Sequence, residues 1–175
     1  MTMQTNREIK AFCPDFDPVR QLLAKHGASF VESRDQVDYY YNLADAPEGN
    51  PRRRLKIRID KEAPQVIYYE EGQESGGRTS SFRIWGLNGH ETKEMLDAVL
   101  GVRAVVNKQR EIWTKDNVVF NLDEVESLGQ ILEVEIRLDD GFEVEAQLRE
   151  YQELFGPYLG DEIDGSNEDL VDLLI

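Results

Sequence analysis

The stretch NLDEVESLGQILEVEI, residues Asn121–Ile136, decides the fold, because it reads as two neighbouring strands joined by a tight connection. Asp123 lies in the first strand, and residues 124–129 read as a hairpin connection in which Gly129 supplies the turn. Side chains alternate across a strand, so Glu133 and Glu135 share one face of the second strand. The apolar residues Leu132, Val134 and Ile136 take its other face.

Two carboxylates side by side repel each other unless a cation or basic groups lie between them. The face of Glu133 and Glu135 therefore either meets open water or holds a metal ion. Alternation of apolar and charged residues is also typical of a half-buried strand with one solvated face. The pair alone leaves both interpretations open, and the rest of the chain has to decide between them.

Size and composition predict one domain, residues 1–175, and exclude several classes of function. The net charge is −15, from 20 Lys+Arg and 35 Asp+Glu, which argues against general binding of nucleic acid or anionic membranes. The chain has neither an apolar run long enough to span a membrane nor a secretory signal, so we expect a cytoplasmic protein. Cys13 is the single cysteine, which excludes an internal disulfide and a cysteine-based metal cluster.

The hydrophobic pattern predicts mostly strands, with a few helices between them. Strands are expected at 5–12, 30–43, 52–60, 65–71, 78–85, 102–113, 117–125 and 131–138. Helices are expected at 19–26, with Asp17 as N-cap, at about 89–100, capped by Asn88, at about 143–155, and at 169–174. In the second helix, Met95, Leu96, Val99 and Leu100 recur at helical spacing and predict a core-facing side.

A basic strand stands out in the middle of the chain. In the segment RRRLKIRID, Arg54, Lys56 and Arg58 fall on one face, and Leu55, Ile57 and Ile59 on the other. Such a row of cations indicates an anion site. An exposed edge strand guarded by positive charge is the alternative, and this strand alone does not separate the two.

Taken together, the charged strand faces suggest an enclosed polar channel. The acids are Glu8, Asp123, Glu133 and Glu135, and the bases are Lys10, Lys56, Arg58, Arg78, Lys108 and Arg110. Six cations and four anions would meet if these faces pointed inward. Antiparallel strands with short connections, and with helices to cover an apolar outer face, close most naturally into a barrel. We therefore predict an α+β fold: an antiparallel β-barrel that forms a tunnel, with helices packed outside.

Five motifs in order resemble the CYTH superfamily, the triphosphate tunnel fold of class IV adenylyl cyclases, thiamine triphosphatases and inorganic triphosphatases. The Glu-x-Glu-x-Lys motif corresponds to residues 6–10, the Gln-x-Asp-x-Tyr strand to 36–40, and the basic strand to 55–58. Paired bases at 108–110 and the closing motif at 122–135 complete the series. The resemblance covers nearly the whole chain.

The resemblance implies an eight-stranded barrel that binds Mg²⁺ or Mn²⁺ and a triphosphate. Carried over by position, the metal ligands would be Glu8, Glu133 and Glu135, with Asp123 as a ligand or as an orienting group. The phosphate-binding residues would be Lys10, Lys56, Arg58, Arg78, Lys108 and Arg110. Glu8, beside Lys10, is the candidate for assisting deprotonation, and we expect both at the mouth of the tunnel.

Two positions depart from the family pattern. Asn6 replaces the first glutamate of the N-terminal motif, so one metal site loses a charge. Glu70 stands where many members carry a lysine at the end of the strand, which calls a phosphate contact into question; Arg78 is the candidate to compensate.

Three kinds of function remain open from the sequence. The leading one is a metal-dependent enzyme that hydrolyses an inorganic or organic triphosphate, or cyclises ATP; tripolyphosphate, thiamine triphosphate and ATP are the candidate substrates. Cyclisation needs a base-binding pocket, to which tyrosines 39–41, 68 and 69 could contribute by stacking, although strand aromatics are more often core. The alternatives are a polyphosphate-binding module without turnover and a purely structural barrel. The choice between monomer and homodimer also stays open.

Overall fold

The computed structural model describes residues 3–48, 50–61, 64–74, 77–86, 91–139 and 141–172. Its strands are β1 (Gln4–Phe12), β2 (Ser29–Tyr41), β3 (Arg52–Ile59), β4 (Gln65–Glu74), β5 (Gly77–Gly86), β6 (Val102–Lys115), β7 (Val118–Val125) and β8 (Gly129–Arg137). Its helices are α1 (Phe16–Lys25), α2 (Glu91–Leu100), α3 (Val144–Phe155) and α4 (Asn167–Asp172), with a short 3-10 helix at Gly156–Tyr158.

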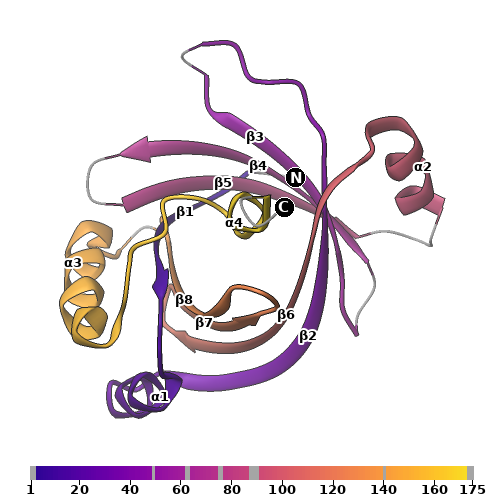
Figure 1. Cartoon of the computed structure of the whole chain (residues 1–175). Helices are drawn as coiled ribbons and strands as arrows, with labels where there is room; N and C mark the ends of the chain where they lie inside the picture. Colours follow the sequence, from indigo (N-terminus) through magenta and orange to yellow (C-terminus); the bar gives the residue numbers. More distant parts are fainter. Residues whose placement is uncertain are drawn as a thin grey trace.

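The strands form a closed antiparallel barrel, which confirms the predicted fold class (Figure 1). Around the barrel the order is β1, β5, β4, β3, β2, β6, β7 and β8, and β8 pairs with β1 to close the ring. The β7–β8 hairpin turns as expected, with Gly129 at φ +92° and Ser127 at φ +68°. Closure pairs every strand on both sides over at least part of its length, which limits exposed sheet edges.

The main hydrophobic core lies outside the barrel, between its wall and two helices. Figure 1 shows α1 and α3 against the outer surface of the ring. The apolar face of β8, Leu132, Val134 and Ile136, packs there with Phe120 of β7. Helix α3 contributes Leu148, Tyr151 and Phe155, and α1 contributes Phe16, Val19 and Leu23. With its apolar face turned to these helices, the strand alternation directs Glu133 and Glu135 inward.

Helix α1 begins earlier than the sequence predicts. Its N-cap is Asp15, whose side chain accepts a hydrogen bond of 2.9 Å from the backbone N–H of Asp17. The predicted cap, Asp17, therefore lies in the first turn, where a carboxylate also interacts favourably with the helix dipole. Pro18 is accommodated because the first-turn N–H groups need no intrahelical partner.

The prediction that α2 presents Met95 and Val99 to the core is wrong. These two side chains are 55% and 72% exposed. The helix turns its other side toward the barrel, where Asp97 accepts a hydrogen bond of 2.8 Å from Tyr41 and Lys93 lies over the ring of Tyr39. The other two residues of the predicted stripe, Leu96 and Leu100, are half-buried, so a polar and cation–π attachment accompanies only partial apolar burial. The predicted start of this helix at Asn88 and Gly89 falls outside the described residues.

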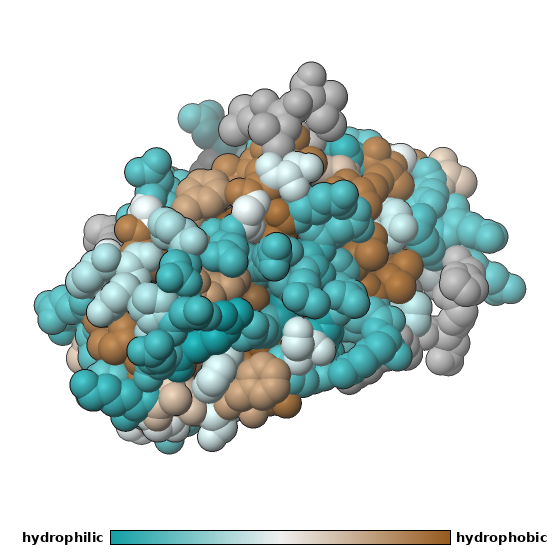
Figure 2. Space-filling model, turned by 60° about the horizontal axis from the view of Figure 1, so that its bottom comes forward, coloured by the Kyte–Doolittle hydropathy of each residue, from teal (hydrophilic) through white to brown (hydrophobic). Residues whose placement is uncertain are grey.

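The face turned forward in Figure 2 is mostly hydrophilic, and its apolar side chains lie in scattered patches. Among the described residues, no helix combines the length and apolarity needed to cross a bilayer.

The outer core predicts a sharp contrast between two valine-to-alanine changes. Val134 is fully buried, whereas Val99 is largely exposed. We expect Val134→Ala to lower the free energy of unfolding by about 2 kcal/mol, because it removes buried methyl groups and leaves a cavity. Val99→Ala is the matched control and should change it by less than about 0.5 kcal/mol. Equal midpoints of the two variants in urea would contradict this placement of the core.

Candidate functional site

The barrel encloses a cavity of about 400 Å³ whose lining is rich in charge. Among the described residues, nine basic and four acidic side chains line it. Nine of the ten predicted site residues are among the lining residues: Glu8, Lys10, Lys56, Arg58, Arg78, Lys108, Arg110, Glu133 and Glu135. The sequence-based expectation that the charged strand faces point inward is therefore met.

One part of the basic wall is organised by Asp38 of β2. Its carboxylate accepts two hydrogen bonds of 2.8 Å from Arg58 and one of 2.8 Å from Lys56. Burial alone would raise the pKa of Asp38, but the charges of Arg58 and Lys56 hold it well below its ordinary value. Asp38 is thus an ionised anchor that fixes the direction of both cations.

Asp123 plays the same part for a second pair of bases. Its carboxylate accepts a hydrogen bond of 2.8 Å from Lys108 and two of 2.6 Å from Arg110. It is 1% exposed and lies behind these bases rather than in the cavity lining. This position makes Asp123 an orienting group for the two bases, whereas its expected place beside a metal, as a ligand or as an orienting group, is a separate matter. A metal role for Asp123 stays a prediction.

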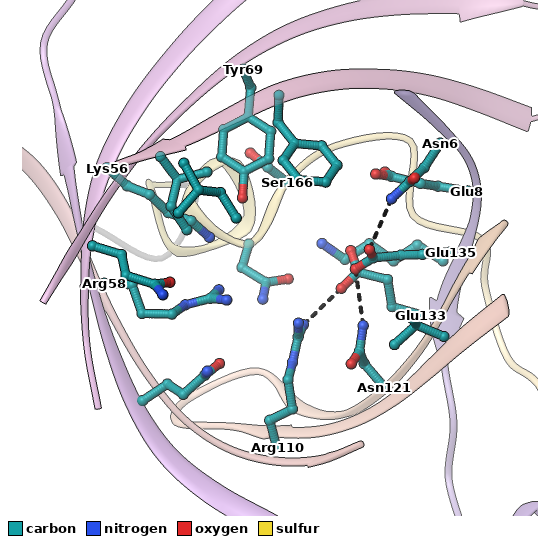
Figure 3. A pocket seen from close by; sticks show the side chains of 18 of the residues that line it. Asn6, Glu8, Lys56, Arg58, Tyr69, Arg110, Asn121, Glu133, Glu135 and Ser166 are labelled. Atoms are coloured by element: carbon teal, nitrogen blue, oxygen red, sulfur yellow. Dashed lines mark hydrogen bonds and ion pairs between the residues drawn. The ribbon is translucent and has the colours of Figure 1, made fainter. Parts of the chain in front are cut away.

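The acidic wall faces these bases from β1 and β8 (Figure 3). Glu8 accepts hydrogen bonds of 2.5 and 2.9 Å from Arg78, and Glu133 accepts one of 2.7 Å from Arg110. Glu135 accepts bonds of 3.0 Å from the Asn6 amide and 2.9 Å from the Asn121 amide. Asn6 therefore orients the Glu135 carboxylate through a hydrogen bond, and it adds no negative charge of its own.

The enclosure shifts the protonation of the interior groups. Burial lowers the pKa of Lys10, Lys56 and Lys108 to about 8 each. Burial, followed by the nearby charges of Glu133 and Glu8, raises the pKa of Glu135 to about 7. Near neutral pH the lysines are still charged, while one carboxyl of the acidic wall is close to protonation.

The donor chemistry of the acidic wall fits a divalent cation such as Mg²⁺ or Mn²⁺. Glu8, Glu133 and Glu135 offer carboxylate oxygens, the ligands these ions prefer, and their mutual repulsion would be relieved by a positive ion. Among the residues that the structure describes, no three acidic, histidine or cysteine side chains already form a metal-binding group. Their present partners, Arg78, Arg110 and two amides, occupy these oxygens.

Two placements differ from the sequence-based expectations. Lys10 is not at the mouth of the tunnel, because its carbonyl accepts a hydrogen bond of 2.9 Å from Ile163 at the end covered by the C-terminal segment. Glu8 precedes it on the same strand and is also buried. Glu70 points away from the cavity and accepts a bond of 3.1 Å from Tyr68, so it removes no tunnel contact. The acid of this strand that faces inward is Glu71, which pairs with Arg54 and Arg78.

Several interior residues were missed from the sequence. Asp38, Asn121 and Glu71 share strand parity with predicted or lining residues, so the alternation rule could have found them. Of the tyrosines considered for stacking, Tyr40 and Tyr69 line the cavity, and cations already lie close to both rings. Ser166 and Asn167 also line it, and no sequence pattern indicated them.

Comparison with known proteins places the chain in a family. The model of the CYTH domain matches residues 4–167, and the chain therefore belongs to the CYTH family. A Methanocaldococcus jannaschii protein named "Putative adenylate cyclase" is 28% identical over 149 residues, which are 84% of this chain and 85% of that protein.

Solved structures share the fold. A Pyrococcus horikoshii protein superimposes with a TM-score of 0.76 at 22% identity, over 94% of this chain and 98% of the other. A Hippeastrum protein, described as a "putative adenylyl cyclase" with a dominant triphosphatase activity, gives a TM-score of 0.59 at 15% identity, over 95% of this chain and 94% of the other. A chain of the Schizosaccharomyces pombe Mediator head module gives 0.56 at 14% identity, over 90% and 98%.

The anchoring role of Asp38 can be tested by its effect on stability. Asp38→Asn leaves Lys56 and Arg58 buried without their carboxylate, so we expect a loss of about 3 to 5 kcal/mol in the free energy of unfolding. Adding tripolyphosphate should restore part of this loss if its oxygens replace the missing charge. The matched control is Asp35→Asn on the same strand, whose side chain is exposed. Calorimetry showing equal melting temperatures for the two variants would contradict the role.

Proposed function

We propose that this protein is a divalent-metal-dependent enzyme that hydrolyses a triphosphate inside the barrel. The observation that carries the proposal is the pairing of two walls: fixed, buried cations on β3 and β6 face carboxylates on β1 and β8. Membership of the CYTH family and the likeness to named cyclases and a triphosphatase support the same class of reaction.

The basic wall would bind the phosphate chain. Arg58 and Arg110 each keep N–H donors beyond those that their carboxylate partners accept, and Lys56 and Lys108 add compact charges. Their directions are set in advance by Asp38 and Asp123, so little reorganisation is needed when a ligand enters. In a buried site such pre-oriented cations stabilise the charge that develops during phosphoryl transfer more strongly than they would in water.

The acidic wall would hold the metal and prepare the nucleophile. Glu133, Glu135 and Glu8 are the proposed ligands, and Asn6 and Asn121 orient Glu135 through its two oxygens. A bound Mg²⁺ or Mn²⁺ would neutralise phosphate charge and polarise the phosphoryl group. Glu8 is the proposed acceptor of the proton from the attacking oxygen, with Lys10 close by on the same face of β1.

Hydrolysis and cyclisation differ in the nucleophile. With water as the nucleophile, the products are shorter phosphates. With the 3′-hydroxyl of ATP, attack on the α-phosphate gives a cyclic nucleotide and pyrophosphate. Hydrolysis is preferred because it needs no base-binding pocket, and because cations already cover the two tyrosine rings that line the cavity.

A binding module without turnover is the second candidate, and Asn6 is the observation that favours it. This amide removes one negative charge from the acidic wall and holds Glu135 by a hydrogen bond. A weakened metal site would leave the phosphate-binding wall intact. Such a protein would bind tripolyphosphate and yield no product at any metal concentration.

The decisive experiment follows product formation from tripolyphosphate, ATP and thiamine triphosphate with Mg²⁺ or Mn²⁺. We expect phosphate release, reduced at least about tenfold in Glu133→Gln, because the amide is a poorer metal ligand of unchanged size. Glu124→Gln, an exposed residue of β7, is the matched control and should retain full activity. Cyclic nucleotide as the main product would instead establish the cyclase reaction.

Binding without any product would overturn the enzyme proposal in favour of the binding module. If tripolyphosphate also failed to bind, both would be wrong. Isothermal titration calorimetry with the same protein samples separates these two results.

The lowered pKa of Lys56 predicts how the affinity for tripolyphosphate depends on pH. Lys56 has a pKa of about 8, so it is charged at neutral pH and loses its proton as the pH rises. An anion binds the charged form better, and we expect affinity for tripolyphosphate to fall through this range. Lys56→Arg keeps its charge, so between about pH 7 and about pH 9 its affinity should fall less than that of the native protein, by a factor of up to about ten. Identical pH profiles for the two proteins would rule out a contact between Lys56 and the phosphate.

A further inference from the structure

The end of the chain closes one end of the tunnel. After α3, residues 160–163 run along the edge of β1 that β5 leaves uncovered. The N–H of Gly160 donates to the Phe12 carbonyl at 2.8 Å, and the N–H of Phe12 donates to the Asp161 carbonyl at 3.1 Å. This pairing delivers α4 across the opening of the barrel, where Figure 1 shows it inside the outline of the ring.

Ion pairs and apolar contacts hold α4 in that position. Arg52 of β3 donates to Asp169 at 2.5 and 2.6 Å, and Arg54 donates to Glu168 at 3.1 Å. Glu168 is 1% exposed, so its carboxylate depends on these arginines. Leu170 and Val171 pack against the cluster of buried residues at this end of the barrel. Helix α4 is therefore fixed to the barrel by both ion pairs and apolar packing.

This closure gives the cavity a polar floor. Ser166 and Asn167 are both buried and line the cavity, and Figure 3 labels Ser166 among the lining side chains. The Ser166 hydroxyl is already committed to Asp169 at 2.8 Å. The side-chain oxygen of Asn167 and the Nε of Arg54, by contrast, have no hydrogen-bond partner among the described residues.

Unpaired polar groups at a buried floor indicate a ligand that completes their hydrogen bonds. The Nε–H of Arg54 is a donor, and the Asn167 amide, once turned, presents its NH2 group as a second donor, so the two groups suit an acceptor such as a phosphate oxygen. Lys56 and Arg58 continue the row of cations from Arg54 along β3, and the three together span about 13 Å at the rise of a strand. A linear anion lying along this row would have one end at the floor.

We propose that Arg54 and Asn167 form a binding site for the terminal phosphate of a linear polyphosphate. The site rests on the proposed function, since it presumes that a triphosphate enters the tunnel. It adds that the polyphosphate is recognised by its free end, which meets the floor of the cavity at α4. A linear triphosphate has such an end, whereas cyclic trimetaphosphate carries as many phosphates and has none.

The experiment measures binding of tripolyphosphate and of trimetaphosphate by calorimetry to the native protein and to Asn167→Asp. The new carboxylate would face the terminal phosphate, and like charges at such a site are strongly unfavourable. We expect the dissociation constant of tripolyphosphate to rise at least about tenfold. The dissociation constant of trimetaphosphate should change by less than about threefold. Asn50→Asp, an exposed residue with the same change of charge, is the matched control.

The results separate failure of this site from failure of the proposed function. If the native protein binds no tripolyphosphate, the proposed function fails. If it binds, and Lys56→Ala weakens binding while Asn167→Asp does not, the floor site is wrong. An equal loss for both phosphates would also refute end recognition, because it indicates a general change of charge. Should Asn167→Asp not fold, Asn167→Ala is measured in its place, with a smaller rise of about threefold expected for tripolyphosphate alone.

Discussion

The cost of enclosing charged side chains in a barrel governs the whole structure. A buried ion without a partner is destabilising by several kcal/mol, so each cation of the interior needs a carboxylate. The chain meets this need with one repeated unit, in which a single buried carboxylate holds two basic residues that stand two apart on a strand. Asp38 holds Lys56 and Arg58, Asp123 holds Lys108 and Arg110, and Glu168 holds Arg52 and Arg54.

The same unit links stability to recognition. A carboxylate behind the bases fixes their geometry while leaving their outer donors toward the cavity, so the groups that stabilise the barrel would also prepare it for the proposed anionic ligand. The protein as a whole carries a charge of −15, and its overall field does not attract an anionic ligand. Affinity has to come from the local arrangement inside the tunnel, where a low dielectric strengthens each contact.

Strand alternation explains how much of this could be predicted. The parity of residues along β1, β3, β5, β6 and β8 was readable from the sequence, and it placed nine of the ten predicted site residues in the cavity lining. The expectation that Glu70 replaces a phosphate contact failed, because adjacent residues of a strand face opposite sides. The residue that faces inward is the next one, Glu71. It also missed Asn167, whose position depends on the path of a long C-terminal segment and not on a local period. The burial of Met95 and Val99 was predicted wrongly for a related reason. Helical spacing identifies an apolar stripe on a helix, but it does not show whether another element packs against that stripe.

The closure of the barrel also sets an order in which the molecule can form. Strand β1 pairs with β8, so Asn6 lies opposite Arg137 and Lys10 opposite Glu133, partners separated by more than a hundred positions in the chain. Such long-range pairing carries a large loop-closure entropy and is associated with slow folding. During synthesis β1 leaves the ribosome long before β8, so the edge of β1 that pairs with β8 stays unpaired until the ring can close. The acidic wall is split between these two strands, and so the cation site proposed above is complete only once β1 and β8 have paired.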